Sequence, residues 1–283
     1  MKIKKAIITA ASRTQRHIPL QTVIDRDGHP RSVLSLLLDE IADTGIKETA
    51  LVVSPGDEDL YREAAPGHQE RLRFYVQEEA RGYGHAVHCA RDFTGDDPFL
   101  LMVSDHLYVS DDPEASCAAQ LISAAERHAS SMSAVQATHE SKLPYFGAIA
   151  GRQYKTFDHL YGITRVAEKP TPTFAEQELV VPGMRQAHYL CFFGMHVLSP
   201  DIMTILDNQL AELAVDQNLN LSPALNELAH CSQYLALEVQ GRRYDLEERY
   251  GLLYGHLAVA LKSPYRDEVL SGLVDLLARS ANR

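Results

Sequence analysis

Cysteine is scarce in this sequence, and no two cysteines lie close together. The 283 residues contain four of them, and no Cys-x-x-Cys motif occurs. They are Cys89, Cys117, Cys191 and Cys231. This spacing argues against a cysteine-bound metal and favours reduced thiols in a cytoplasmic protein. Long apolar runs are missing as well. No stretch approaches the ~20 apolar residues of a membrane span, so we expect no membrane partner.

An excess of positive charge is also missing. The sequence has 27 lysines and arginines against 38 aspartates and glutamates, which gives a formal net charge of −11. Nucleic acids and anionic membranes both require a basic surface, so we expect neither as a partner. Small phosphorylated ligands remain compatible with this balance, because a local basic cluster can exist in an acidic protein.

The first predicted strand ends in a turn that lacks glycine. Residues 7–22 read IITAASRTQRHIPLQT, and no lysine occurs between Lys5 and Lys47. A phosphate-binding turn after a first strand normally needs glycine, so that backbone N–H groups can close on the anion. Two interpretations stay open. Either the side chains of Arg13 and Arg16 supply the positive charge, or the turn is only a connector.

The first half of the sequence alternates strand and helix patterns. Apolar and alternating runs predict strands over residues 4–11, 48–54, 71–77, 98–105 and 130–139. Apolar residues at helical spacing predict helices over residues 31–45, 56–65, 84–93 and 112–129. This alternation favours a parallel sheet covered by helices on both faces, in which ligands bind at the carboxyl ends of the strands.

The second half is richer in strand patterns and continues without a linker. Strands are expected in the segments YFGAIAGRQY, GITRVAEKP, AHYLCFFGMHVLS and QYLALEVQGRRYD. Helices are expected over residues 199–213, 221–231, 249–261 and 265–280. Residues 171–187 are predicted to form an exposed excursion. The whole chain is therefore expected to form one continuous domain.

The most informative segment is QEEARGYGHAVHCARDF, residues 77–93. Gln77 ends a strand, and its amide can pair with the donor and acceptor edge of a pyrimidine. Gly82 and Gly84 permit close approach of a flat ligand to the backbone. The alternative is a strand–turn–helix joint in which the glycines only relieve steric crowding.

Acidic and basic residues follow two further strands. Asp105 comes directly after a buried strand, where a carboxylate can hold Mg²⁺ or cap a turn. Glu168 and Lys169 follow another strand in the segment AEKP. A glutamate can accept hydrogen bonds from sugar hydroxyls and a lysine can neutralise a phosphate, although both residues would also suit a surface ion pair.

The segment GRRYD follows a late strand and offers one more carboxylate. Asp245 could be a second metal ligand, with Arg242 or Arg243 holding a phosphate.

Together these motifs resemble the bacterial UTP–glucose-1-phosphate uridylyltransferases, members of the sugar-phosphate nucleotidyltransferase superfamily. The resemblance covers residues 4–262 and is carried by Gln77 with GYGHAV, Asp105, YFGAI, AEKP and GRRYD. Two departures stand out. GRRYD has arginine in place of the usual lysine, and the first turn has lost both glycines of the family's Gly-x-Gly-Thr-Arg loop.

The resemblance implies a fold and a reaction. The fold is a Rossmann-like α/β domain of the nucleotide-diphospho-sugar transferase type, with a mixed, mostly parallel sheet flanked by helices. One domain would span residues 1–283, with a nucleotide-binding half (1–140), a sugar-phosphate-binding half (141–262) and a C-terminal helix (263–283). A sugar 1-phosphate would attack the α-phosphate of UTP with Mg²⁺ as cofactor, giving a UDP-sugar and pyrophosphate.

The resemblance also implies site residues. Nucleotide binding falls to Ala10, Ala11, Ser12, Gln77, Gly82, Gly84 and His85. Sugar binding falls to Gly147, Glu168 and Tyr189, and metal binding to Asp105 and Asp245. Arg13, Arg16, Lys169 and Arg242 are the expected catalytic residues, which contact phosphates.

Several alternatives stay open. A homologue without its phosphate-binding turn would bind a nucleotide sugar as a sensor, without turnover. Another nucleotide or sugar phosphate would also fit, since uracil and thymine share the edge that a glutamine reads. A glycosyltransferase is disfavoured because its Asp-x-Asp motif is absent near Asp105. Family members often form dimers or tetramers through C-terminal helices, so the resemblance leaves a homo-oligomer open, and the sequence itself does not indicate the oligomeric state.

Overall fold

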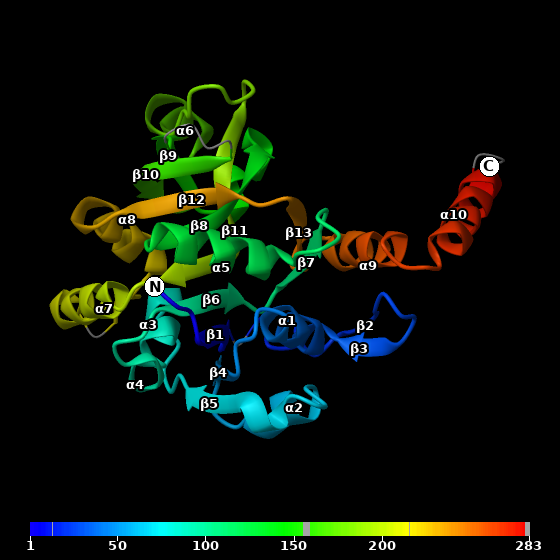
Figure 1. Ribbon diagram of the computed structural model, residues 1–283, viewed down its shortest axis with the longest axis horizontal. Helices are drawn as coiled ribbons and strands as arrows, with labels where there is room; N and C mark the ends of the chain where they lie inside the picture. Colours follow the sequence, from blue (N-terminus) through cyan, green and yellow to red (C-terminus); the bar gives the residue numbers. More distant parts are fainter. Residues whose placement is uncertain (13, 155–158, 215, 281–283) are drawn as a thin grey trace.

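The protein is built around one large mixed sheet (Figure 1). A computed structural model describes residues 1–12, 14–154, 159–214 and 216–280. The sheet has nine strands in the order β5-β4-β1-β6-β11-β8-β12-β10-β9. These strands are β1 (Lys5–Ala10), β4 (Glu48–Val53), β5 (Leu72–Val76), β6 (Phe99–Val103), β8 (Ser131–His139), β9 (Ala148–Gln153), β10 (Leu160–Ala167), β11 (His188–Leu198) and β12 (Tyr234–Glu238).

Helices cover both faces of this sheet. They are α1 (Val33–Ala42), α2 (Glu58–Glu63), α3 (Tyr83–His88), α4 (Arg91–Thr94), α5 (Cys117–His128), α6 (Pro172–Glu178), α7 (Asp201–Glu212), α8 (Leu221–Cys231), α9 (Gly251–Leu261) and α10 (Arg266–Ser280). Successive residues of a strand point to opposite faces. Ile8 therefore packs in the core under α1 and α5, whereas Ile7 packs in the core under α3, α7 and α8.

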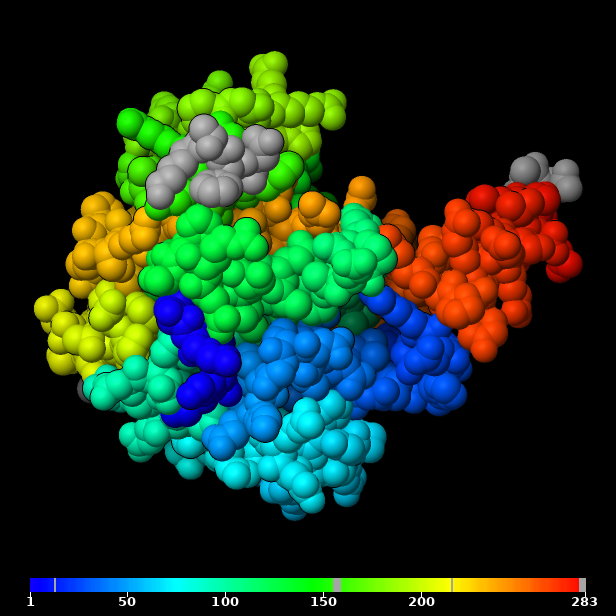
Figure 2. Space-filling model, viewed as in Figure 1, coloured from blue at the N-terminus to red at the C-terminus, as the bar shows by residue number. Residues whose placement is uncertain are grey.

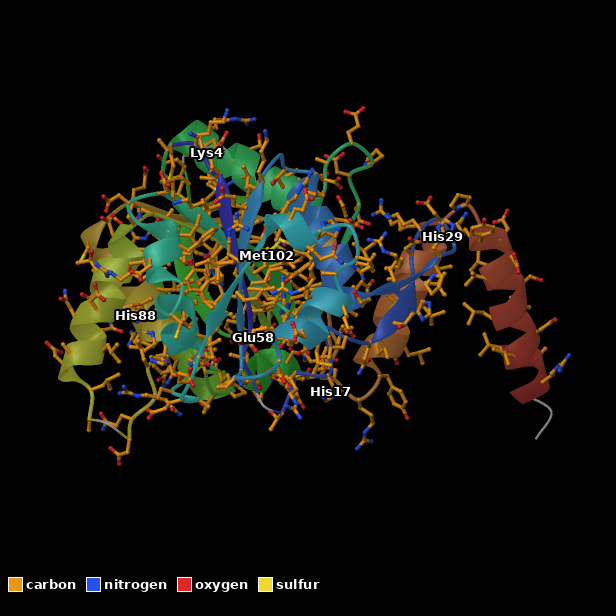
Figure 3. The ribbon with its side chains drawn as sticks, turned by 90° about the horizontal axis from the view of Figure 1, so that it is seen from below. Lys4, His17, His29, Glu58, His88 and Met102 are labelled. Carbon is orange, nitrogen blue, oxygen red and sulfur yellow. The ribbon has the colours of Figure 1, made fainter. Side chains whose placement is uncertain are left out.

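The first four strands of the sheet, β5 to β6, run parallel. The central residues of β1, β4 and β6 are buried, whereas those of the edge strand β5 are partly exposed. Met102 of β6 lies in the middle of the packed side chains (Figure 3). Beyond β6 the sheet becomes mixed, because β11 pairs antiparallel with both β6 and β8. The predicted α/β fold is confirmed. Its continuous parallel part is formed by the amino-terminal strands, and β8 and β12 form a further parallel pair.

A small ribbon outside the main sheet joins two distant parts of the chain. Strands β7 (His106–Ser110) and β13 (Gly241–Asp245) pair antiparallel, with His106 opposite Asp245. A similar two-stranded ribbon is formed by β2 (Thr22–Ile24) and β3 (Pro30–Ser32). The β7–β13 pairing brings Asp245 beside the residues that follow β6, although the two segments lie far apart in the sequence.

Two local expectations were wrong in part. The segment 171–187 is not simply an exposed excursion, because Thr171 caps helix α6 and the side chain of Ala175 is buried. The helix expected over residues 84–93 is divided into α3 and α4, which are separated around Ala90.

Helices α9 and α10 extend away from the sheet (Figure 1), and α10 forms the tip of this arm on the surface of the molecule (Figure 2). Val274, Leu276 and Leu277 of α10 are largely exposed. Within the described residues, every helix is too short or too polar to cross a membrane.

Gly251, the first residue of α9, determines how closely this helix approaches β13. A Cβ atom there would lie 1.7 Å from the carbonyl oxygen of Asp245, so the backbone would have to move. We expect Gly251→Ala to lower the free energy of unfolding by about 3 kcal/mol or more. Gly272→Ala is the matched control, because a Cβ at Gly272 in α10 meets nothing within 4 Å.

Urea denaturation measures both variants. Alanine is the better helix former, so Gly272→Ala should be neutral or stabilise the protein by up to about 1 kcal/mol. Equal stability of Gly251→Ala and the wild-type protein would contradict the close approach of α9 to β13.

Candidate active site

A cavity of about 560 Å³ lies at the carboxyl ends of strands β1 and β6. This is where ligands bind in open α/β sheets. The residues around it come from segments that are far apart in the sequence. Nine of the residues expected in the site line it: Ala10, Ala11, Ser12, Gln77, Gly82, Asp105, Glu168, Lys169 and Asp245.

The two expected metal carboxylates both line this cavity. Asp105 follows β6, and Asp245 ends β13. His106 Nδ1 lies 2.6 Å from Asp105 Oδ1. Burial raises the pKa of Asp105, but the charge and hydrogen bond of His106 outweigh it, so the net pKa lies below its ordinary value. Burial raises the pKa of Asp245.

The donor set suits a metal that needs few protein ligands. The described residues contain no cluster of three or more histidine, cysteine, aspartate or glutamate side chains able to hold a metal ion. Mg²⁺ is usually bound by one or two carboxylates, with water and substrate phosphates completing its coordination. Asp105 and Asp245 fit this pattern. Of the described lining residues, four are carboxylates and one, Lys169, is a lysine or arginine, so a bound cation would offset the negative charge.

The first turn is ordered without glycine, because its neighbours hold the backbone. Buried Tyr61 donates its hydroxyl to the carbonyl of Ala10 at 3.2 Å and to that of Arg16 at 3.0 Å. Ser54 donates to the carbonyl of Ala11 at 2.9 Å. The turn after β1 is therefore fixed in shape by contacts with the segment after β4.

One of the two arginines expected in this turn, Arg16, is engaged outside the cavity. Arg16 Nη1 lies 3.3 Å from Asp57 Oδ1, and Arg16 is absent from the described lining residues. Arg13 lies outside the described residues. His17 is exposed at the edge of the molecule (Figure 3). The proposed gathering of triphosphate by arginines remains a prediction.

Both glycines of GYGHAV are explained by packing. Gly82 has φ 95°, and a Cβ there would lie 2.6 Å from the carbonyl oxygen of Leu219. A Cβ at Gly84 would lie 2.9 Å from the backbone of Asn220. The segment before α8 therefore occupies the space that the glycines leave. Gly82 also lines the cavity, whereas Gly84 is absent from its described lining.

Gln77 is held in one orientation by its neighbours. Its Nε2 lies 3.1 Å from the carbonyl oxygen of Gly82 and 2.9 Å from Nδ1 of His85. A carbonyl oxygen can only accept, so the amide nitrogen must face Gly82. This contact leaves Oε1 of Gln77 without a hydrogen bond among the described residues. Gln77 thus presents an acceptor to a ligand in the cavity.

His85 supports this orientation rather than lining the cavity. Its Nδ1 can accept from Gln77 only if the ring is neutral and carries its proton on Nε2. Burial lowers the pKa of His85, and the positive charge of Arg81 lowers it further. The environment therefore favours the neutral ring that this contact requires.

The expected sugar-binding residues are only partly brought together. Glu168 accepts a hydrogen bond from Ser222 Oγ at 2.5 Å, and a Cβ at Gly147 would lie 3.1 Å from Glu168 Oε2. Lys169 has φ 42°, a conformation that lysine seldom adopts and that is often found at functional sites. Tyr189 is buried in a small core cluster and does not appear among the described lining residues.

The two arginines of GRRYD lie on opposite faces of β13. Arg242 is exposed and is not among the described residues that line the large cavity. Arg243 is 8% exposed and shares its face of the strand with Asp245. The catalytic role expected of Arg242 is untested. The buried side chain at this position of the fold is that of Arg243.

His106 lines the cavity, in agreement with its position directly after a buried strand, although no role was assigned to it. Sequence reasoning missed other lining residues, among them Tyr83, Tyr145, Asn218 and Glu247. Asn218 carried no signal of its own, because its position depends on the packing of residues 218–220 against the glycine turn.

The chain that forms this cavity matches a known protein family. The family model described as nucleotidyl transferase matches residues 17–240, more than three quarters of the chain. The chain belongs to the nucleotidyl transferase family. Residues 7–16, which include the start of the first turn, lie outside the matched residues, and so does the GRRYD segment, residues 241–245.

Two curated relatives of this nucleotidyl transferase carry the same name. UTP–glucose-1-phosphate uridylyltransferase 2 of Streptococcus pyogenes serotype M3 is 27% identical over 303 residues, covering 97% of this chain and 96% of the relative. UTP–glucose-1-phosphate uridylyltransferase 2 of Staphylococcus saprophyticus is 29% identical over 287 residues, covering 92% and 93%.

Solved structures show the same fold. A UTP-bound UGPase from Acinetobacter baumannii matches with a TM-score of 0.71 at 21% identity, covering 96% of this chain and 98% of that one. A UDP-glucose pyrophosphorylase complexed with UDP-glucose matches with a TM-score of 0.72 at 20% identity, covering 91% and 97%. The nucleotide-diphospho-sugar transferase fold expected from the sequence is thereby confirmed.

The state of His85 can be measured directly. We expect its ring to titrate below about 6.5, the ordinary histidine pKa, and to carry its proton on Nε2 when neutral. A depressed pKa stabilises the folded protein above pH 6.5, and this contribution is lost as the pH falls through the ordinary value towards the lowered one. NMR titration of the ring nitrogens reports both quantities. A neutral ring protonated on Nδ1 would contradict the contact with Gln77.

Proposed function

We propose that this nucleotidyl transferase forms UDP-glucose and pyrophosphate from UTP and glucose 1-phosphate. The names of the curated relatives and of the solved neighbours support UTP and glucose 1-phosphate as the substrates. The observation that carries the proposal is the convergence of Asp105, Asp245, Gln77 and Lys169 on one cavity. These residues come from four separate segments and supply a cation site, a base contact and a phosphate contact.

The proposed reaction needs no covalent bond to the protein. A phosphate oxygen of the sugar 1-phosphate attacks the α-phosphorus of UTP, and the bond between the α- and β-phosphates breaks as pyrophosphate leaves. Bound Mg²⁺, held by Asp105 and Asp245, would neutralise the charge that the phosphates bring to the cavity. Both Lys169 and Glu168 line the cavity, where Lys169 would contact a phosphate and Glu168 would accept hydrogen bonds from sugar hydroxyls.

The orientation of Gln77 supports a uracil-type base. Its free Oε1 can accept a hydrogen bond from a ring N–H, which uracil and thymine carry at N3. In cytosine, N3 carries no hydrogen and is an acceptor. Its lone pair would face the lone pairs of Gln77 Oε1, so no hydrogen bond would form. Because Gly82 holds the amide nitrogen, Gln77 cannot turn to suit cytosine without losing that hydrogen bond.

A sensor without turnover is the second candidate function. Its support is the first turn, where Arg16 forms an ion pair with Asp57 and so is already paired with an anion of the protein. Lys169 is the one lysine or arginine in the described lining of the cavity. A sensor would bind the nucleotide sugar yet release no pyrophosphate.

Two further expectations accompany the proposal. The four cysteines are free thiols, which supports a reducing cytoplasmic location. The exposed apolar residues of α10 support self-association. The cytoplasmic location and the homo-oligomer both stay predictions.

Pyrophosphate release separates the two functions. With UTP, glucose 1-phosphate and Mg²⁺, we expect steady release that stops when EDTA removes the metal. Asp105→Asn should reduce kcat roughly a hundredfold or more, the scale for removing a group that stabilises developing charge. Arg152→Gln is a suitable control, since Arg152 is an exposed residue remote from the cavity lining. Calorimetric binding of UDP-glucose without any release would favour the sensor.

Base selection tests the contact at Gln77. Gln77→Leu removes the acceptor, so kcat/KM for UTP should fall while the low value for CTP changes little. A neutral hydrogen bond contributes about 0.5–1.5 kcal/mol, so kcat/KM for UTP divided by kcat/KM for CTP should fall roughly 2- to 12-fold. Competition assays with both nucleotides in one mixture measure this ratio. An unchanged ratio would show that another group selects the base.

A further inference from the structure

Arg243 is a buried cation without a paired anion. Its side chain is 8% exposed, and no carboxylate of the described residues forms an ion pair with it. Its Nε and Nη1 are buried and have no hydrogen-bond partner among the described residues. Nη2 makes one long contact, 3.4 Å to Thr138 Oγ1. Burying a charge without a partner costs several kcal/mol, so this arrangement calls for a compensating group.

A small cavity lies beside this guanidinium. It measures about 160 Å³, and its described lining includes Arg243, Lys142, Thr138, Phe146 and Asp245. At ~30 Å³ per water, that volume holds about five waters, or one oxyanion with a water or two. A nucleotide is far too large for it. Asp245 lines both this cavity and the large one, so the two adjoin.

The remaining charges leave Arg243 available to an anion. Lys142 Nζ lies 2.7 Å from both carboxylate oxygens of Glu248, so these two residues neutralise each other. The face of the guanidinium is packed against the Phe146 ring, 3.9 Å from its centroid. Stacking uses the face of an arginine and leaves its edge donors free. Nη1 and Nη2 share the outer edge of the guanidinium and match two oxygens of a phosphate, because Nη1 has no partner and the contact of Nη2 with Thr138 is long.

We propose that the cavity around Arg243 and Lys142 is a binding site for a single phosphate-sized oxyanion. The anion accepts hydrogen bonds from Nη1 and Nη2 of Arg243. Lys142 neutralises Glu248, which also lines this cavity, so that this carboxylate does not repel the anion. The phosphate group has two sources in the proposed reaction, the sugar 1-phosphate and the released pyrophosphate, and free phosphate is a third. The anion site itself rests on Arg243 and its cavity, whereas the assignment of the source rests on the proposed function.

Inorganic phosphate is the probe for the site, because its binding needs no turnover. Thermal unfolding of the full chain is followed as phosphate replaces chloride at constant ionic strength. A ligand that binds the folded protein raises Tm as its concentration rises. We expect Arg243→Met to weaken the apparent affinity for phosphate roughly ten- to hundredfold, the range for losing hydrogen bonds to a charged group.

Arg249→Met is the matched control. Arg249 is exposed and is not among the described lining residues of either cavity. Its replacement by methionine changes the net charge of the protein as much as Arg243→Met does. It should keep the phosphate-dependent rise in Tm. In phosphate-free buffer, Arg243→Met should be as stable as the wild-type protein or more stable, because replacing a buried unpaired charge with an apolar chain is often neutral or favourable.

Lys142→Met provides a second test if Arg243→Met fails to fold. The Lys142 side chain is 44% exposed, so its replacement should be tolerated, yet it leaves Glu248 unpaired beside the anion. Phosphate affinity should fall in this variant too. Equal phosphate-dependent shifts in the wild-type protein, Arg243→Met and Lys142→Met would overturn the proposal. So would a loss of the shift in Arg249→Met as large as that in Arg243→Met.

Kinetics then distinguish the sources of the phosphate. If the site holds the sugar phosphate, Arg243→Lys should raise KM for glucose 1-phosphate and leave KM for UTP unchanged. If it holds the product, pyrophosphate should inhibit the wild-type protein more strongly than Arg243→Lys. An inactive wild-type protein that still binds phosphate through Arg243 would refute the proposed function and leave the anion site standing.

Discussion

The antiparallel pairing of β7 with β13 is the constraint on which the site depends. It places Asp245 opposite His106, and thereby beside Asp105, although well over a hundred residues separate the two strands. β7 is joined to the end of β6 and moves with the parallel sheet. The close approach of α9 through Gly251 holds the other strand in place. Two carboxylates that repel each other are thus brought to one cavity, where a bound cation would offset their repulsion.

The distribution of charge divides the site into two regions. The large cavity is rich in carboxylates, so a triphosphate entering it needs a cation as well as Lys169. The small cavity shares Asp245 with the large one and has a balanced lining, with Arg243 and Lys142 against Asp245 and Glu248. Arg243 is the unpaired cation in this described lining, because Lys142 pairs with Glu248.

The glycine-free turn shows how one local rule can be replaced by tertiary contacts. Glycine normally lets such a turn adopt its shape, whereas here Tyr61 and Ser54 hold the carbonyls of Ala10 and Ala11. The neighbouring strand–helix connection therefore holds the described backbone at the start of this turn. In the glycine turn after Gln77 the reverse applies. There the glycines admit the backbone of residues 219–220 and, through Gly82, orient the Gln77 amide.

Local sequence patterns were sufficient for the alternation of strands and helices and for the α/β class. The nine lining residues came from the resemblance to a known family. Those that follow β1, β5 and β6 also lie where residues after parallel strands converge. Local patterns could not decide which arginine of GRRYD faces inward, since period-two alternation separates Arg242 from Arg243 without saying which face is buried. Nor could they place Asn218 or identify His85 as the partner of Gln77. Those outcomes depend on contacts between distant segments, and such contacts exist only once the chain has packed.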